Sequence, residues 1–112
     1  MRDSKLYLKD ILEAILSIEK FVKGINFENF RNDDLKSSAV IRKFEIIGEA
    51  ARNVPANIKK EYSSIPWKNM AGMRDRLIHF YFGIKYELVW ETIKEDIPKI
   101  KLLIKRVLKE LE

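Results

Sequence analysis

The residues best suited to chemistry lie in one short stretch, residues 73–83, with the sequence MRDRLIHFYFG. His79 is the only histidine in the chain, and imidazole is the side chain whose ordinary pKa lies closest to neutrality. Acid–base chemistry at pH 7 therefore passes most easily through His79. Arg74 and Arg76 carry guanidinium groups, whose charged donors match the oxygens of a phosphate. No other segment of the chain combines a base, a charge clamp and a hydroxyl.

Each of these side chains also has an ordinary structural role. A histidine on a bundle helix is more often partly buried and hydrogen-bonded than catalytic. The arginines could lie on a solvated helix face and pair with Asp75. Tyr81 could simply pack its ring and keep its hydroxyl in water. The residue types alone therefore leave both chemistry and packing open.

Helical geometry limits how these side chains can meet. At about 100° per residue, Asp75 and His79 share a face, as do Arg76 and His79. Arg74 and Tyr81 share another face, roughly 140° around the axis. One regular helix cannot point all of them at one spot. A joint site therefore needs either a bend in the helix or a cleft where two copies of the segment meet, and a symmetric dimer is the simpler solution.

Apolar residues at alternating spacings of three and four predict the helices that position this stretch. The predicted elements are a helix over 3–25, a polar connection with two aromatic residues over 25–34, a helix over 35–54, a short charged helix within 53–66, a helix from Pro66 to near Gly83, and a last helix over 85–112. Short connections favour antiparallel neighbours. We therefore expect an all-α antiparallel bundle of four main helices plus a short helix, in a single domain over residues 1–112.

Four residues predict details of these helices. Ser4 is a candidate N-cap of the first helix, and Gly24 lies where that helix should stop. Gly48 sits inside the second helix at a cost of about 1 kcal/mol relative to alanine. The close approach of another helix backbone would explain it. Pro98 removes one backbone hydrogen bond, so we expect a kink there or a restart with Pro98 in a first turn.

Composition bounds the remaining possibilities. The 112 residues are 46% hydrophobic and 35% charged, which describes one globular domain. There is no cysteine, and the charged start MRDSKLYLKD lacks the apolar core of a secretory signal. We therefore expect a cytoplasmic protein with no membrane association. The net charge of +5 favours a polyanionic partner such as RNA, or an acidic protein.

Other chemistries find little support in the sequence. Glu45 and Glu49 stand at i and i+4, but di-metal bundles need Glu-x-x-His pairs, which this chain lacks. We expect these glutamates to pair with Arg42 or Arg52 instead. A glycine-rich phosphate loop, a nucleophile elbow and a zinc-binding histidine pair are also missing from the sequence. The sequence therefore predicts neither a metal nor a cofactor.

Three segments of the chain resemble the HepT-like branch of the HEPN superfamily. The family's signature is an arginine, four residues of which the first is usually polar, a histidine, one further residue and a tyrosine. Arg74, Asp75, His79 and Tyr81 match it. The segments are FEIIGEAARNVP at 44–55, IPWKNMAGMRDRLIHFYFGI at 65–84 and VWETIKEDIP at 89–98.

The resemblance implies the toxin half of a type VII toxin–antitoxin pair, a metal-independent endoribonuclease that works as a homodimer with an HEPN-like fold. Arg74 would stabilise the scissile phosphate, His79 would be the general acid or base, and Asp75 would orient one of them. The antitoxin of the family, MntA, is a minimal nucleotidyltransferase, and it would silence the toxin by adding AMP to Tyr81. This chain departs from the pattern in two ways. Asp75 stands where asparagine is common, and Phe80 places a large ring beside His79.

A second interpretation belongs to another functional class. The chain could be a non-catalytic helical module that docks a nucleotidyltransferase and serves as its substrate. Tyr81 would then be the important residue and His79 would be structural. Replacement of His79 by alanine separates the two interpretations, because only the ribonuclease would lose its activity.

Overall fold

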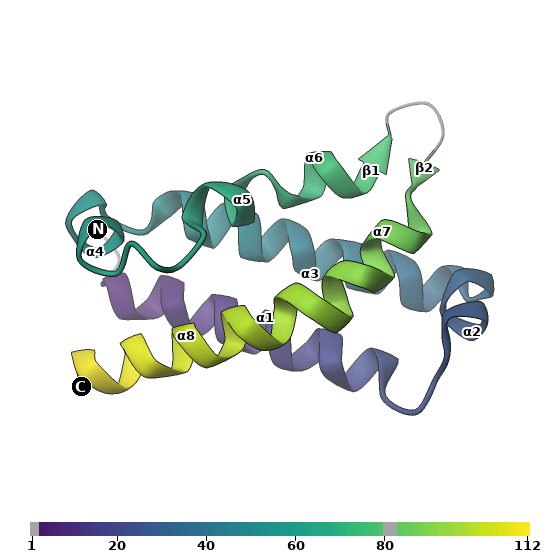
Figure 1. Cartoon of the computed structure of the whole chain (residues 1–112), viewed down its shortest axis with the longest axis horizontal. Coiled ribbons are helices and arrows are strands. Elements are labelled where there is room, and N and C mark those ends of the chain that lie inside the picture. Colours follow the sequence, from purple (N-terminus) through teal and green to yellow (C-terminus); the bar gives the residue numbers. More distant parts are fainter. Residues whose placement is uncertain (1–2, 80–82) are drawn as a thin grey trace.

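Long helices that lie side by side make up most of the fold (Figure 1). The computed structural model describes residues 3–79 and 83–112, and of His79 it describes only the backbone. The elements, in chain order, are α1 (Ser4–Val22), α2 (Phe27–Asn32), α3 (Asp34–Asn53), α4 (Ala56–Glu61), α5 (Trp67–Ala71), α6 (Met73–Leu77), β1 (Ile78–His79), β2 (Gly83–Ile84), α7 (Tyr86–Glu91), the π-helical turn η1 (Thr92–Asp96) and α8 (Ile97–Leu111). The predicted all-α bundle is confirmed, and the homodimer stays a prediction.

The N-cap of the first helix lies one residue earlier than predicted. Asp3, rather than Ser4, is the N-cap of α1, and its carboxylate accepts a hydrogen bond from the backbone N–H of Lys5 at 3.0 Å. A carboxylate there also interacts favourably with the positive end of the helix dipole. At the other end α1 stops at Val22, and Gly24 follows with φ of +76°, as a C-terminal stop requires.

The predicted polar connection between the first two long helices contains a short helix, α2. Its N-cap, Asn26, accepts a hydrogen bond from the backbone N–H of Asn29 at 2.8 Å, and the Asn29 side chain accepts one from the backbone N–H of Asn26 at 3.4 Å. Phe30 is fully buried and its ring lies 5.3 Å from that of Trp90, between ring centroids. The connection is therefore a packed element. Six residues are too few to show a helical period.

Close packing of α3 against α5 explains the glycine in the middle of α3. A Cβ atom at Gly48 would lie 3.1 Å from the carbonyl oxygen of Met70 and 3.2 Å from that of Ala71. These two residues end α5, so another helix backbone does approach Gly48 as predicted. Along the rest of its length α3 packs against α1 and α6.

The helix predicted from Pro66 to Gly83 is wrong in its second half. It breaks at Gly72 into α5 and α6, and helical structure ends at Leu77. Ile78 is extended, with φ of −123° and ψ of 126°, as its β-branched side chain favours. Strands β1 and β2 then pair antiparallel, and the backbone N–H of Lys85 donates to the carbonyl of Leu77 at 2.9 Å. That bond satisfies a carbonyl which the end of α6 leaves without a helical partner.

The last helical segment is continuous but changes its winding before Pro98. The backbone N–H of Ile97 donates to the carbonyl of Thr92, five positions earlier, so η1 is a π-helical turn. Pro98 then stands in the first turn of α8, directly after this π-helical turn. The first-turn position predicted for Pro98 is confirmed, whereas the helical segment continues through it without a restart.

Candidate active site

Helix α6 turns its charged residues outward because its apolar residues anchor the opposite side. Met73 and Leu77, one turn apart, are buried at 1% and 0% relative exposure. Arg74, Asp75 and Arg76 lie between them and are all exposed. The amphipathic pattern of five residues therefore places the predicted charge clamp at the surface.

Arg74 is held from a distant part of the chain. Its Nε donates to Oε2 of Glu45 at 2.9 Å, and its Nη1 lies 3.6 Å from Oδ1 of Asp75. The Arg74 side chain is still 51% exposed and the Glu45 side chain 34%. The expected pair with Asp75 is present, whereas the stronger contact with Glu45 was not predicted.

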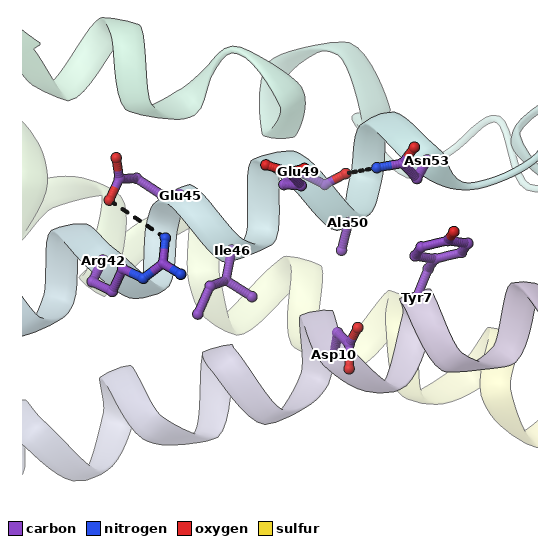
Figure 2. A pocket seen from close by; sticks show the side chains of 8 residues that line it. All are labelled: Tyr7, Asp10, Arg42, Glu45, Ile46, Glu49, Ala50 and Asn53. Carbon is purple, nitrogen blue, oxygen red and sulfur yellow. Dashed lines mark hydrogen bonds and ion pairs between the residues drawn. The ribbon is translucent and has the colours of Figure 1, made fainter. Parts of the chain in front are cut away.

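Glu45 serves two arginines with its two oxygens. Oε1 faces Nη1 of Arg42 at 3.9 Å, while Oε2 accepts from Arg74. Figure 2 shows Arg42 and Glu45 on α3 above a pocket of about 230 Å³, whose other wall comes from α1. The predicted pairing of Glu45 with Arg42 is therefore confirmed.

Arg52, the other arginine expected near these glutamates, binds a backbone carbonyl in the described part of the chain. Its Nη2 donates to the carbonyl oxygen of Ala71 at 3.0 Å. Ala71 is the last residue of α5, so its carbonyl lacks a partner within the helix. Arg52 thus caps α5.

A small pocket of about 160 Å³, which we call the Arg74 pocket, lies between α3 and the junction of α5 with α6. Its charged lining comprises Arg42, Arg52, Arg74, Glu45, Glu49 and Asp75. Three cations face three carboxylates, so the formal charge around the pocket is balanced. The positive net charge of the chain is therefore not concentrated here.

Arg76 lies on the other side of α6 from Arg74. It lines a separate pocket of about 310 Å³, together with Asn69, Asp96 and Lys99. Two residues along a helix correspond to about 200° around its axis, which accounts for the separation. Arg74 and Arg76 therefore do not line a common pocket in the described chain, and their role in binding phosphate stays a prediction.

His79 lies in strand β1, two residues beyond the end of α6. Its backbone pairs with that of Gly83. The predicted sharing of one helical face by Asp75, Arg76 and His79 is therefore wrong, because the helix ends before His79. The chain changes direction within the stretch, and the cleft between two copies stays a prediction. Tyr81 lies outside the described residues.

Two classes of feature are missing from the part of the chain that the structure describes. Within residues 3–79 and 83–112, no three histidine, cysteine, aspartate or glutamate side chains gather as they would around a metal ion. None of the helices in the same ranges combines the length and the apolar character needed to span a bilayer.

Known proteins resemble the chain over nearly all of its length. The relatives include "Probable ribonuclease HepT" of Thermococcus cleftensis, 52% identical over 100 residues, which are 89% of this chain and 91% of that protein. Two proteins named "Putative RNase" are also similar. The one from Methanocaldococcus jannaschii is 47% identical over 99% of this chain and 96% of its own. The one from Caldanaerobacter subterraneus subsp. tengcongensis is 43% identical over 98% of each.

No solved structure shows significant similarity to the chain. A family model described as "Ribonuclease HepT-like" matches residues 11–107, a range that contains the Arg74 pocket, β1 and most of α8. The chain therefore belongs to the ribonuclease HepT-like family.

Proposed function

We propose that the chain is the toxin of a HepT/MntA toxin–antitoxin pair and acts as a metal-independent endoribonuclease. The observation that carries this proposal is the family match over residues 11–107, within which Arg74 and His79 keep the signature spacing. The names of the relatives, which call them ribonucleases, support an RNA substrate. The exposed guanidinium of Arg74, in the first turn of α6, is available to a phosphate from solution.

The proposed reaction needs one base and one phosphate clamp. His79 takes the proton from a ribose 2′-hydroxyl, the 2′-oxygen attacks the adjacent phosphorus, and the bond from phosphorus to the 5′-oxygen breaks. The products are a 2′,3′-cyclic phosphate and a 5′-hydroxyl, which forms when the leaving 5′-oxygen takes up a proton. Arg74 stabilises the charge that develops on the phosphate oxygens, Arg76 contacts RNA phosphate on the other side of α6, and Asp75 orients Arg74.

We propose that two copies assemble into the active unit. The charges around the Arg74 pocket balance within one copy, so the pocket of a single copy offers an RNA strand no net positive charge. A symmetric dimer also brings two identical segments face to face. Light scattering after size exclusion should then give twice the 13.3 kDa of one chain. A mass of one chain at assay concentration would contradict the dimer.

We propose further that an MntA-like nucleotidyltransferase silences the toxin by adding AMP to Tyr81. The tyrosine oxygen attacks the α-phosphate of ATP and pyrophosphate leaves. The added phosphate and nucleoside would compete with RNA for the arginine clamp, because an anion placed close to Arg74 pairs with it. Intact-mass analysis with the partner and ATP should show AMP on the wild type and none on Tyr81→Phe. Equal labelling of both would move the modification elsewhere.

The decisive experiment incubates unmodified protein with mixed RNA in EDTA. The wild type should cleave and His79→Ala should not, while Lys109→Ala, at the far end of α8, should cleave like the wild type. Activity of His79→Ala equal to that of the wild type would remove His79 from the mechanism. The same lack of cleavage by every variant, from protein shown by mass to be unmodified, would favour the non-catalytic module that docks a nucleotidyltransferase.

A further inference from the structure

We infer that Glu45 is a positioning residue, which holds the guanidinium of Arg74 so that one edge faces the scissile phosphate. This inference rests on the proposed function, because it assigns the contact a purpose in cleavage. Glu45 lies on α3, 29 positions before Arg74 in the chain, and the two meet only in the folded structure. The contact therefore links the central helix of the bundle to the proposed catalytic segment.

The geometry of the contact leaves the useful part of the guanidinium available. Glu45 takes the Nε–H of Arg74 at 2.9 Å, which is the N–H closest to the helix. The edge formed by Nη1 and Nη2 stays on the outside of the contact, and Asp75 approaches it only at 3.6 Å, a loose ion pair. A phosphate can bind this edge with two parallel hydrogen bonds. Glu45 therefore binds the Nε end of the guanidinium and does not itself occupy the edge formed by Nη1 and Nη2.

The backbone that carries Arg74 is fixed by the same face of α3. Positions 45, 48 and 52 share this face at i, i+3 and i+7. At Gly48 the carbonyls of Met70 and Ala71 approach α3 closely, and Arg52 binds the carbonyl of Ala71. Glu45 then holds the side chain of Arg74, three residues further along. This face of α3 thus contacts both the end of α5, after which α6 begins, and the side chain of Arg74.

Two other roles for Glu45 predict different results. As a simple ion pair it would matter for stability alone, and partly exposed pairs of this kind contribute little. As a competitor for the phosphate it would lower RNA affinity, so its removal would raise activity. The contact at Nε rather than at the Nη edge argues against competition.

The test compares Glu45→Ala and Glu45→Gln with Glu28→Gln, the same change at an exposed glutamate of α2 that does not line the pocket around Arg74. We expect Glu45→Ala to lower kcat/KM for RNA about tenfold to a hundredfold, the range that a misplaced catalytic group produces. Glu45→Gln keeps an oxygen acceptor and should lie between the wild type and Glu45→Ala. Glu28→Gln should stay within about twofold, because charge changes away from the contact have small effects.

A double-mutant cycle separates positioning from an independent role. If Glu45 acts only through Arg74, Glu45→Ala should cause no further loss in an Arg74→Ala background. The NMR signal of the Arg74 Nε–H should also move in Glu45→Gln and not in Glu28→Gln, and the melting temperature should hardly change. The double-mutant cycle and the NMR signal both report on Arg74 itself. A role of Glu45 in overall stability alone would change neither of them.

Each contrary outcome has a defined meaning. An active wild type with an equally active Glu45→Ala would overturn the positioning role alone. Higher activity of Glu45→Ala would make Glu45 a competitor for the phosphate and would also overturn the positioning role. A double mutant whose loss of activity equals the product of the two single losses would overturn it as well. A wild type that cleaves no RNA would overturn the proposed function first, and the positioning role with it.

Discussion

Replacement of Gly48 by alanine should destabilise the protein, although alanine is the better helix former. The gain in helix propensity is about 1 kcal/mol. Against it, the new Cβ would lie 3.1 Å from the carbonyl oxygen of Met70 and 3.2 Å from that of Ala71, closer than carbon and oxygen normally approach. Relief requires a shift of α5 away from α3.

The size of the effect follows from the rigidity of the two carbonyls. They belong to the backbone at the end of α5, and Arg52 holds the second at 3.0 Å, so neither can rotate away. Forcing extra volume into a close contact costs about 1–3 kcal/mol. Set against the gain in propensity, the net loss for Gly48→Ala should be about 1 kcal/mol. For a chain of this size that lowers the melting temperature by about 4 °C.

Urea unfolding followed by circular dichroism measures this difference, and Gly72→Ala provides the matched control. At Gly72 the nearest atom to a new Cβ is the carbonyl oxygen of Lys68 at 3.6 Å, and φ is −94°, so alanine fits. Gly72→Ala should therefore stabilise the protein by about 0.5 kcal/mol. A Gly48→Ala protein at least as stable as the wild type would refute the reasoning, because α5 would then move at no cost.

Three further changes test other parts of the structure. Phe30→Ala should cost about 3–5 kcal/mol in thermal unfolding, because the ring is fully buried. The ion pair of Lys101 with Glu19, at 2.9 Å between α8 and α1, should give a coupling energy of about 0.5–1 kcal/mol in a double-mutant cycle, and this should fall with added salt. Burial and the nearby Glu110 raise the pKa of Tyr62 above 10.0. Its protonated form therefore contributes stability below pH 10.0 that is lost as the pH rises through the raised pKa, and Tyr62→Phe should weaken that alkaline loss in urea unfolding.

The long helices could be predicted from the sequence because each buries one continuous apolar stripe. The period of 3.6 residues is a local property of the sequence. Gly48 by itself indicates a close contact with another helix, and Pro98 by itself indicates a first helical turn. Helix α2 escaped prediction because its six residues show too little periodicity, and its stability comes from the Asn26 cap and the burial of Phe30. Local pattern therefore predicts elements that bury a long stripe and misses elements that a single packed ring anchors.

The candidate site was predictable only in part. The pairing of Arg74 with Asp75 joins neighbours in sequence, so the local pattern was enough. The contact of Arg74 with Glu45 depends on the register between α3 and α6, which no local pattern encodes. A usable signal did exist in α3, where Glu45 and Arg52 flank Gly48 on one face. The glycine indicates where a second backbone approaches, and polar residues beside it are then the ones that can reach that backbone.

The sequence stretch that matters most is also where the helical prediction fails, and the failure has a physical consequence for the proposed site. A helix continued past Leu77 would place the side chains of Arg74 and His79 about 140° apart around its axis. The chain instead ends α6 at Leu77 and pairs His79 with Gly83, so strand pairing determines where the His79 backbone lies relative to Arg74. Functional sites often break a local rule in this way. The β1–β2 pair is therefore as much a part of the proposed catalytic geometry as the two signature residues.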